Sequence, residues 1–488
     1  MTLIVTCCIG LLILTSTAYA VTYTFTTIDD PEACTNGPGC GTTPTAINNS
    51  GQAVGSYVGS EGVNGFMYSG GQFTSLAPPG GYDTRPGGIN DSGQVVGTYT
   101  YEDTSGYYEM LGFLYSGGQY TTLDAQIPNT FVDSIFFTGI NNDGEIVGDY
   151  DGLPVGYSGG IEQSHGFLYT GGQFTTFDDP QAGTNIPGCL GTYANGINDN
   201  GQVVGNYYDS SGNCHGFLDS SGQFTTLDNP NASLKGGTQP SGINNKGQVV
   251  GTYYDSSGIR HGFLYGGGQF TTLDAPEAGT NCSDCFGTVA ASINDSAQIV
   301  GNYYDSSGTS HGFIAVPTYS ISGTVAGGSG SPLKGVTVAL SGISSSTTQT
   351  ASKGTYSFPG LSVGSYTVTA SMAGYSFKAQ KVTITNQDVP NVNFSGTAVY
   401  LISGTVTLSG HALAGVTITL SGTAEAVVTK GASGTYSLTG LTAGSYTLTP
   451  SMSGYTFSPP NVKVTLNKTS RDVILPLRPC QSTPYRAR

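Results

Sequence analysis

The chain contains little charge and no tryptophan. Only 9% of its 488 residues are charged, whereas Gly occurs 75 times and Tyr 31 times. Soluble helical proteins carry far more Lys, Glu, Ala and Leu, so this composition excludes a mainly helical protein and indicates an all-β protein rich in turns. A chain of this length also favours two or three domains over one.

The motifs of several enzyme classes are missing. The sequence has no G-x-S-x-G elbow, Walker loop or H-E-x-x-H. Residues 21–317 contain only two arginines, Arg85 and Arg260, which excludes the three-arginine carboxylate site of sialidase-like propellers. Acids are plentiful, so a carboxylate pair of the glycosidase kind remains an alternative, although nothing singles out such a pair.

Basic residues are scarce in residues 21–317. This segment holds 28 acids and four Lys or Arg, a net charge of −24, whereas residues 318–488 hold three acids and eleven bases. So acidic a surface repels nucleic acid and other anionic polymers, and we predict no nucleic-acid partner.

The first twenty residues are typical of a signal peptide. An apolar run from Ile9 to Leu14 is too short to span a bilayer and precedes Ala18-Tyr19-Ala20, which fits the cleavage pattern. We therefore predict a secreted or cell-surface protein that does not span the membrane. No Lys or Arg precedes the run, which leaves the position of the start codon open.

One pattern, I-N-[ND]-x-x-[QE]-x-V-G, recurs six times with spacings of 42 to 57 residues, as in a four-strand unit with variable loops. The Ile-Asn pairs begin at Ile47, Ile89, Ile140, Ile197, Ile243 and Ile293. In each unit the first strand ends at Ile-Asn, the second resembles residues 202–208, the third resembles 261–265 and the fourth resembles 269–274.

The order of these segments predicts a closed ring. The mature chain begins with a fourth-strand segment at 23–29, whereas the sixth unit ends with its third strand at 311–315. Pairing the two removes both exposed sheet edges. We therefore predict a six-bladed β-propeller over residues 21–317, closed by the N-terminal strand, with a linear solenoid as the alternative. The run of residues 197–218 resembles the bacterial extracellular HAF repeats, a resemblance that implies secretion and no catalytic residue.

Residues 318–398 and 399–478 match each other at a shift of 80, as in 354–377 and 434–457. Short alternating strands with frequent glycine turns predict two transthyretin-like or Ig-like β-sandwiches, followed by a disordered tail at 479–488. The pattern I-S-G-T-V, G-V-T-V-x-L-S-G and G-S-Y-T-V resembles carboxypeptidase regulatory-like and Cna protein B-type modules. This resemblance implies a stalk or a carbohydrate-binding-like fold without catalysis.

Seven cysteines follow the predicted signal peptide, and export makes disulfides plausible. The disulfide candidates are Cys34, Cys40, Cys189, Cys214, Cys282 and Cys285. We predict a bridge between Cys189 and Cys214. For Cys282 and Cys285 a local loop staple is favoured over a metal site, because no second Cys/His pair accompanies them. The role of Cys480 stays open.

Three sets of residues recur near the loop between the second and third strands, and they are the ligand-face candidates. They are His165, His215, His261 and His311; Tyr208, Tyr254 and Tyr304; and Asp209, Asp255 and Asp305. A structural role is favoured for the histidines, because the first two units carry Asn64 and Leu111 there. Turn formation is favoured for the aspartates. We predict no cofactor and no metal; calcium is the one ion left open, although no D-x-D-x-D-G loop is present.

These features predict an exported, non-enzymatic binding or adhesion protein with a glycan or another cell-surface molecule as its ligand. The propeller would present variable loops, and tyrosine would supply any sugar-stacking surface. The alternatives are a polysaccharide-active hydrolase or lyase with acids at the propeller mouth, and a structural envelope component. The oligomeric state is not predicted.

Overall fold

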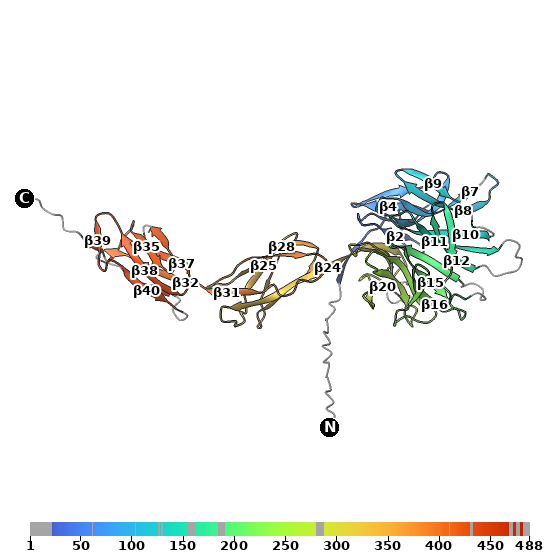
Figure 1. Cartoon of the computed structure of the whole chain (residues 1–488). Coiled ribbons are helices and arrows are strands. Elements are labelled where there is room, and N and C mark those ends of the chain that lie inside the picture. Colours follow the sequence, from blue (N-terminus) through green and yellow to red (C-terminus); the bar gives the residue numbers. More distant parts are fainter. Residues whose placement is uncertain are drawn as a thin grey trace, which may run out of the picture. The chain divides into compact units, whose positions relative to one another are not determined.

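The described chain is built from β-strands alone (Figure 1). The computed structural model describes residues 22–60, 62–102, 104–124, 127, 130–154, 163–183, 191–279, 287–408, 410–429, 433–467, 472–474 and 479–481. No helix occurs in these ranges, so the predicted all-β class is confirmed, and they contain no apolar helix of membrane-spanning length. Residues Tyr23–Pro317 form one compact unit, and the described residues from Thr318 onward belong to the other.

Residues 23–317 contain six four-stranded antiparallel units, numbered here in chain order. Units one to three comprise β2 (Gly41–Ile47), β3 (Ala53–Gly59), β4 (Gly62–Ser69) and β5 (Gln72–Leu76); β6 (Gly81–Ile89), β7 (Val95–Glu102), β8 (Tyr108–Ser116) and β9 (Gln119–Leu123); and β10 (Thr130–Ile140), β11 (Ile146–Pro154), β12 (Gln163–Thr170) and β13 (Gln173–Phe177). Units four and five comprise β14 (Gly191–Ile197), β15 (Gln202–Tyr208), β16 (Cys214–Ser220) and β17 (Gln223–Leu227); and β18 (Thr238–Ile243), β19 (Val249–Tyr254), β20 (Arg260–Gly266) and β21 (Gln269–Leu273).

Unit six takes its fourth strand from the other end of the chain. It comprises β22 (Thr288–Ile293), β23 (Ile299–Tyr304), β24 (Ser310–Gly327) and β1 (Thr22–Thr27), and β1 pairs with β24. Beyond the strand, Ile28 N–H donates to the Gly312 carbonyl at 2.8 Å, and the ring centroids of Phe25 and Phe313 lie 5.1 Å apart. The predicted pairing of the N-terminal strand with the last unit is therefore present in the structure.

The V-G and G-F pairs of the repeat pack against each other inside each unit. In unit four, Val203 and Val204 are both buried although they point to opposite faces of β15, as expected for a sheet covered on both sides. A Cβ atom on Gly205 would meet the Tyr193 carbonyl at 1.9 Å, so only glycine fits there. The Phe217 ring lies against that glycine and is fully buried. The residues that define the sequence repeat are therefore those that pack inside each unit.

Residues 318–396 form a sandwich-like module. One sheet has the order β26-β25-β28-β30, and the C-terminal part of β24 pairs with β27 and β31. The strands are β25 (Thr337–Gly342), β26 (Ser346–Gln349), β27 (Thr355–Leu361), β28 (Gly364–Ser371), β29 (Tyr375–Ser376), β30 (Gln380–Ile384) and β31 (Phe394–Ala398). Apolar side chains from both sheets, among them Ile321, Val368 and Phe394, form its core.

The second module repeats this arrangement. Its strands are β32 (Tyr400–Thr405), β33 (Thr407–Leu408), β34 (His411–Ala412), β35 (Thr417–Gly422), β36 (Ala426–Thr429), β37 (Thr435–Leu441), β38 (Gly444–Ser451), β39 (Tyr455–Phe457), β40 (Val462–Leu466), β41 (Asp472–Ile474) and β42 (Pro479–Gln481). β42 pairs with β39, so residues 479–481 of the predicted disordered tail contribute a short strand, and the tail itself stays a prediction.

Candidate functional site

The asparagine of each Ile-Asn pair joins one unit to the next. Asn198, which is buried, accepts hydrogen bonds at Oδ1 from the N–H groups of Asn200 and Gln202, both at 3.0 Å. Its Nδ2 donates to Gln202 Oε1 at 2.9 Å and to the Asn244 carbonyl at 3.0 Å. The first three bonds shape the turn, and the fourth crosses to the next unit. The Asn and the Gln or Glu of the repeat pattern therefore act together.

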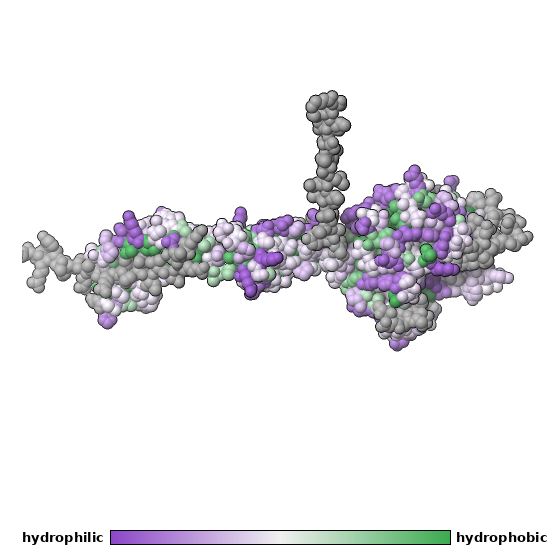
Figure 2. All heavy atoms as spheres, turned by 90° about the horizontal axis from the view of Figure 1, so that it is seen from below, coloured by the Kyte–Doolittle hydropathy of each residue, from purple (hydrophilic) through white to green (hydrophobic). Residues whose placement is uncertain are grey.

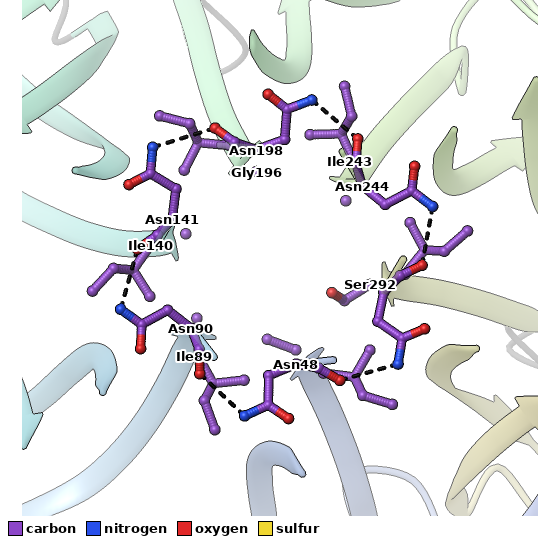
Figure 3. Close-up of a pocket in the computed structure, with 18 of the residues that line it drawn as sticks. Asn48, Ile89, Asn90, Ile140, Asn141, Gly196, Asn198, Ile243, Asn244 and Ser292 are labelled. Carbon is purple, nitrogen blue, oxygen red and sulfur yellow. Dashed lines mark hydrogen bonds between the residues drawn. The ribbon is translucent and has the colours of Figure 1, made fainter. Parts of the chain in front are cut away.

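The bonds between units form a complete cycle, shown in Figure 3. Each asparagine amide donates to the carbonyl of the next asparagine at 3.0 to 3.2 Å, and the last returns from Asn294 to Asn48. The cycle runs through Asn48, Asn90, Asn141, Asn198, Asn244 and Asn294. Because buried amides must find partners, six mutually satisfied ones fix the spacing of the units.

A second polar ring lies one residue further along each turn. Its members alternate between Asn and Asp: Asn49, Asp91, Asn142, Asp199, Asn245 and Asp295. Each Asp Oδ2 accepts hydrogen bonds from the amides of both neighbouring asparagines at 2.7 to 3.0 Å. Each Asp Oδ1 accepts the backbone N–H of one of them. The ring thus pairs three carboxylates with three amides.

The two rings line a small pocket that is open to solvent. Burial acts to raise the pKa of Asp91, but the hydrogen bonds from Asn49 and Asn142 outweigh it and lower that pKa below its ordinary value. A carboxylate held ionised in this way is a poor general acid. In the part of the chain that the structure describes, no three His, Cys, Asp or Glu residues are grouped to hold a metal ion.

Replacing Asn198 by alanine is expected to destabilise residues 23–317 by about 3 kcal/mol, because two partly buried N–H groups and one buried carbonyl lose their partners. Asn200→Ala is the matched control: its exposed side chain makes a single 3.3 Å contact, so a change below about 0.5 kcal/mol is expected. Chemical denaturation of both variants measures the difference. Equal losses would show that the cycle does not stabilise the units.

The four predicted histidines each contact an aspartate at the end of the fourth strand of their own unit. The distance from His Nδ1 to Asp Oδ2 is 2.7 or 2.8 Å in every case. The pairs are His165 with Asp178, His215 with Asp228, His261 with Asp274, and His311 with Asp29. The fourth aspartate comes from the N-terminal segment, so that segment supplies to unit six what the fourth strand supplies elsewhere.

The predicted aspartates contact the same histidines from the other side. Asp209, Asp255 and Asp305 lie 3.5 or 3.6 Å from Nε2 of His215, His261 and His311. Asp209 also accepts the N–H groups of Ser211 and Asn213 within its own turn. Burial acts to raise the pKa of Asp209, but these bonds and one from the Asn213 side chain lower it to about 2. The structure therefore brings the predicted His and Asp residues together unit by unit.

The predicted tyrosines lie at the ends of the second strands and are half-buried. Their carbonyls accept N–H groups from the long loops between units: Gly183 to Tyr208, Ser233 to Tyr254, and Gly279 to Tyr304. The Tyr254 hydroxyl also accepts a hydrogen bond from Arg260 Nε at 2.7 Å. The preceding tyrosines, Tyr207, Tyr253 and Tyr303, stack on the histidines. These contacts organise each rim loop.

Two of the disulfide candidates are bonded to each other in the structure, Cys34 and Cys40. Cys214 is buried at the start of β16, with its Sγ 3.9 Å from the Thr238 carbonyl. Its predicted partner Cys189 lies outside the described residues, as do Cys282 and Cys285. The bridge between Cys189 and Cys214 therefore stays a prediction.

The sequence analysis missed a group of exposed apolar side chains on unit two. Tyr107 and Tyr108 are 73% and 67% exposed, and Tyr82 and Met110 are also exposed. Elsewhere on residues 23–317, the face seen in Figure 2 carries small hydrophobic groups scattered among polar ones. The available signal was the departure of unit two from the Y-Y-D-S-S-G pattern, since Tyr99 is followed by T-Y-E-D-T-S-G-Y-Y.

The two C-terminal modules match a known domain family. Residues 320–396 and 401–477 each match the carboxypeptidase regulatory-like domain, which confirms the predicted resemblance there. A curated relative, the chitinase ChiA of Flavobacterium johnsoniae, is 43% identical over 107 residues, which is 20% of this chain and 7% of that protein. The chain thus corresponds to a small part of that relative. The HAF resemblance of residues 21–317 stays a prediction.

Several solved structures are similar at low identity. The minor pilin GBS52 of Streptococcus agalactiae is 16% identical and covers 35% of this chain and 100% of its own, with a TM-score of 0.19. The Bacillus anthracis TIE protein is 13% identical over 73% of this chain and 59% of its own, with a TM-score of 0.20. The Aleuria aurantia lectin is 13% identical over 56% and 96%, with a TM-score of 0.36. Scores of this size do not establish a shared fold.

Proposed function

We propose that residues 21–317 form a six-bladed β-propeller closed by the N-terminal strand. The asparagine cycle supports closure, because its last bond joins unit six to unit one. The pairing of β1 with β24 and the contact of Asp29 with His311 support the assignment of β1 as the missing fourth strand. The flanking assignments are a signal peptide at 1–20 and sandwich modules at 318–398 and 399–478.

The chain is an exported, non-enzymatic binding or adhesion protein. The main support for this proposal is the exposed aromatic group of unit two. The other candidates, the rim histidines, already contact aspartates of their own units. Side chains of this kind mark interaction sites on soluble proteins. The rim histidines and aspartates are bound to each other in a repeated structural pattern, which favours a scaffold role for them.

The two C-terminal modules serve as a stalk or as carbohydrate-binding-like domains. Their match to the carboxypeptidase regulatory-like family supports the proposal, and the partial similarity to a protein named as a chitinase is consistent with a polysaccharide setting.

The full chain is expected to co-sediment with at least one insoluble polysaccharide or with bacterial cells, and to release no reducing ends from any polymer. Heat-denatured protein serves as the control for unspecific adsorption. Release of reducing ends would contradict the proposal and favour the polysaccharide-active alternative. Retention by neither polysaccharides nor cells would contradict it in favour of a structural envelope component.

A further inference from the structure

Three members of the exposed group of unit two, Tyr82, Tyr108 and Met110, lie on one face of an extended hairpin. β7 and β8, labelled in Figure 1, pair Thr100 with Met110 and Glu102 with Tyr108, and β6 pairs Tyr82 with Thr100. Directly paired residues share a face of a sheet, and so do residues two apart along a strand. These five side chains therefore lie on one face, which we call the aromatic face.

The two tyrosines of this face contact each other. The ring centroids of Tyr82 and Tyr108 lie 5.9 Å apart, with an interplanar angle of 82°, which is the edge-to-face arrangement that aromatic rings prefer. Partial burial raises the pKa of the Tyr82 hydroxyl, and the nearby Tyr108 and Glu102 add to that effect. The carboxylate thus belongs to the same small surface as the two rings.

The opposite face of the hairpin fixes its position. Tyr99 on β7 is buried, and Tyr101 and Leu111 pack against a core formed by units one and two. Residues on this face alternate with those of the aromatic face, so the exposed rings are carried by strands that are anchored from behind. A rigid aromatic surface loses little conformational entropy when it binds a partner.

The side chains of the aromatic face and the charge of the surrounding residues favour one class of ligand. Tyrosine rings offer flat apolar surfaces for the C–H faces of sugar rings, and the Thr100 hydroxyl and the Glu102 carboxylate offer hydrogen bonds to sugar hydroxyls. The net charge of −24 over residues 21–317 opposes an anionic partner. A neutral polysaccharide satisfies both conditions.

We propose that the aromatic face is a binding site for a neutral polysaccharide, with Tyr82 and Tyr108 stacking on its sugar rings and Glu102 accepting hydrogen bonds from its hydroxyls. This assignment rests on the proposed binding function and names its ligand class and its residues. The equivalent hairpins of units four to six turn earlier, with Asp209, Asp255 and Asp305 at the position of Tyr101, so those three units do not repeat this site.

The test measures depletion isotherms of the full chain on cellulose, chitin, β-1,3-glucan and mannan, with alginate as the anionic comparison. Tyr108→Ala and Tyr82→Ala are each expected to weaken binding about tenfold, whereas Tyr108→Phe keeps the ring and is expected to bind within about twofold of the original. Leu234→Ala is the matched control, because Leu234 is an exposed apolar residue outside this face; unchanged binding is expected. Melting temperatures verify that each variant folds.

Four results would overturn the inference. Neutral polysaccharide binding that survives Tyr108→Ala and Tyr82→Ala would place the site elsewhere and leave the proposed binding function intact. Retention by cells but by none of the four neutral polymers would contradict the proposed ligand class and leave the proposed binding function intact. Equal binding to alginate would contradict neutrality, and self-association abolished by Tyr108→Ala would identify the partner as a second copy of the chain. Turnover of a polymer would instead contradict the proposed function.

Discussion

Removing residues 22–30 is expected to lower the melting temperature of residues 23–317 by about 10 °C or more. The deletion removes the buried Ile28, the Phe25 contact with Phe313 and the bond between Asp29 and His311. It also exposes the edge of β24, which proteins avoid. The loss should appear as a shift of the whole calorimetric transition, because β1 completes a unit that contacts both neighbours.

A pair of equivalent substitutions provides the control. Asp29→Asn and Asp228→Asn remove the negative charge beside the histidine in units six and four, and similar destabilisation is expected from both. Burial acts to lower the pKa of His311, but the hydrogen bond with Asp29 raises it overall, so Asp29→Asn should lower that pKa in an NMR titration. An unchanged melting temperature after the deletion would refute closure by the N-terminal strand.

Replacing Asp149 by asparagine is expected to stabilise the protein at pH 7 by about 3 kcal/mol. Asp149 is 6% exposed on β11, and burial first and Asp151 second raise its pKa to about 8. The folded protein therefore binds this proton more tightly than the unfolded chain does. The stability that Asp149 contributes is complete below about pH 4 and is lost as the pH rises toward 8, so Asn should help most at neutral and alkaline pH.

Other units already carry asparagine at the position of Asp149, and unit three offers a control substitution. Asn206 and Asn302 occupy the equivalent position in units four and six and are buried there, so an amide fits. Asp143→Asn changes an exposed acid of the same unit and should leave the melting temperature within about 2 °C. If the stability curves of Asp149→Asn and the original protein run parallel between pH 4 and pH 8, the carboxyl of Asp149 is not perturbed as inferred.

The strands were largely predictable because their apolar pattern is also their packing pattern. The second strand predicted at residues 202–208 coincides with β15, and the all-β class follows from composition. The partner of each Ile-Asn asparagine was not predictable. The sequence indicates that Asn198 begins a turn, but its bond to the Asn244 carbonyl depends on how two sheets pack, which no local pattern specifies.

The site residues illustrate the same limit. The histidines were identified because they recur, whereas their partners at the ends of the fourth strands were missed, since a hairpin brings together residues thirteen positions apart. Tyr82 and Tyr108 were missed for a related reason. They belong to one unit only, and the irregular pairing between Tyr82 and Arg85 shifts the register that a repeat alignment would assume.

The alternation of Asn and Asp in the second polar ring requires an even number of units. Each carboxylate needs an amide on both sides, so a ring with an odd number of units would place two amides or two carboxylates side by side. Two adjacent carboxylates would repel each other, and two adjacent amides would lose the carboxylate oxygen that they share in this structure. Gaining or losing two units would preserve this alternation, so the repeating element of the polar ring is a pair of units that contributes one Asn and one Asp.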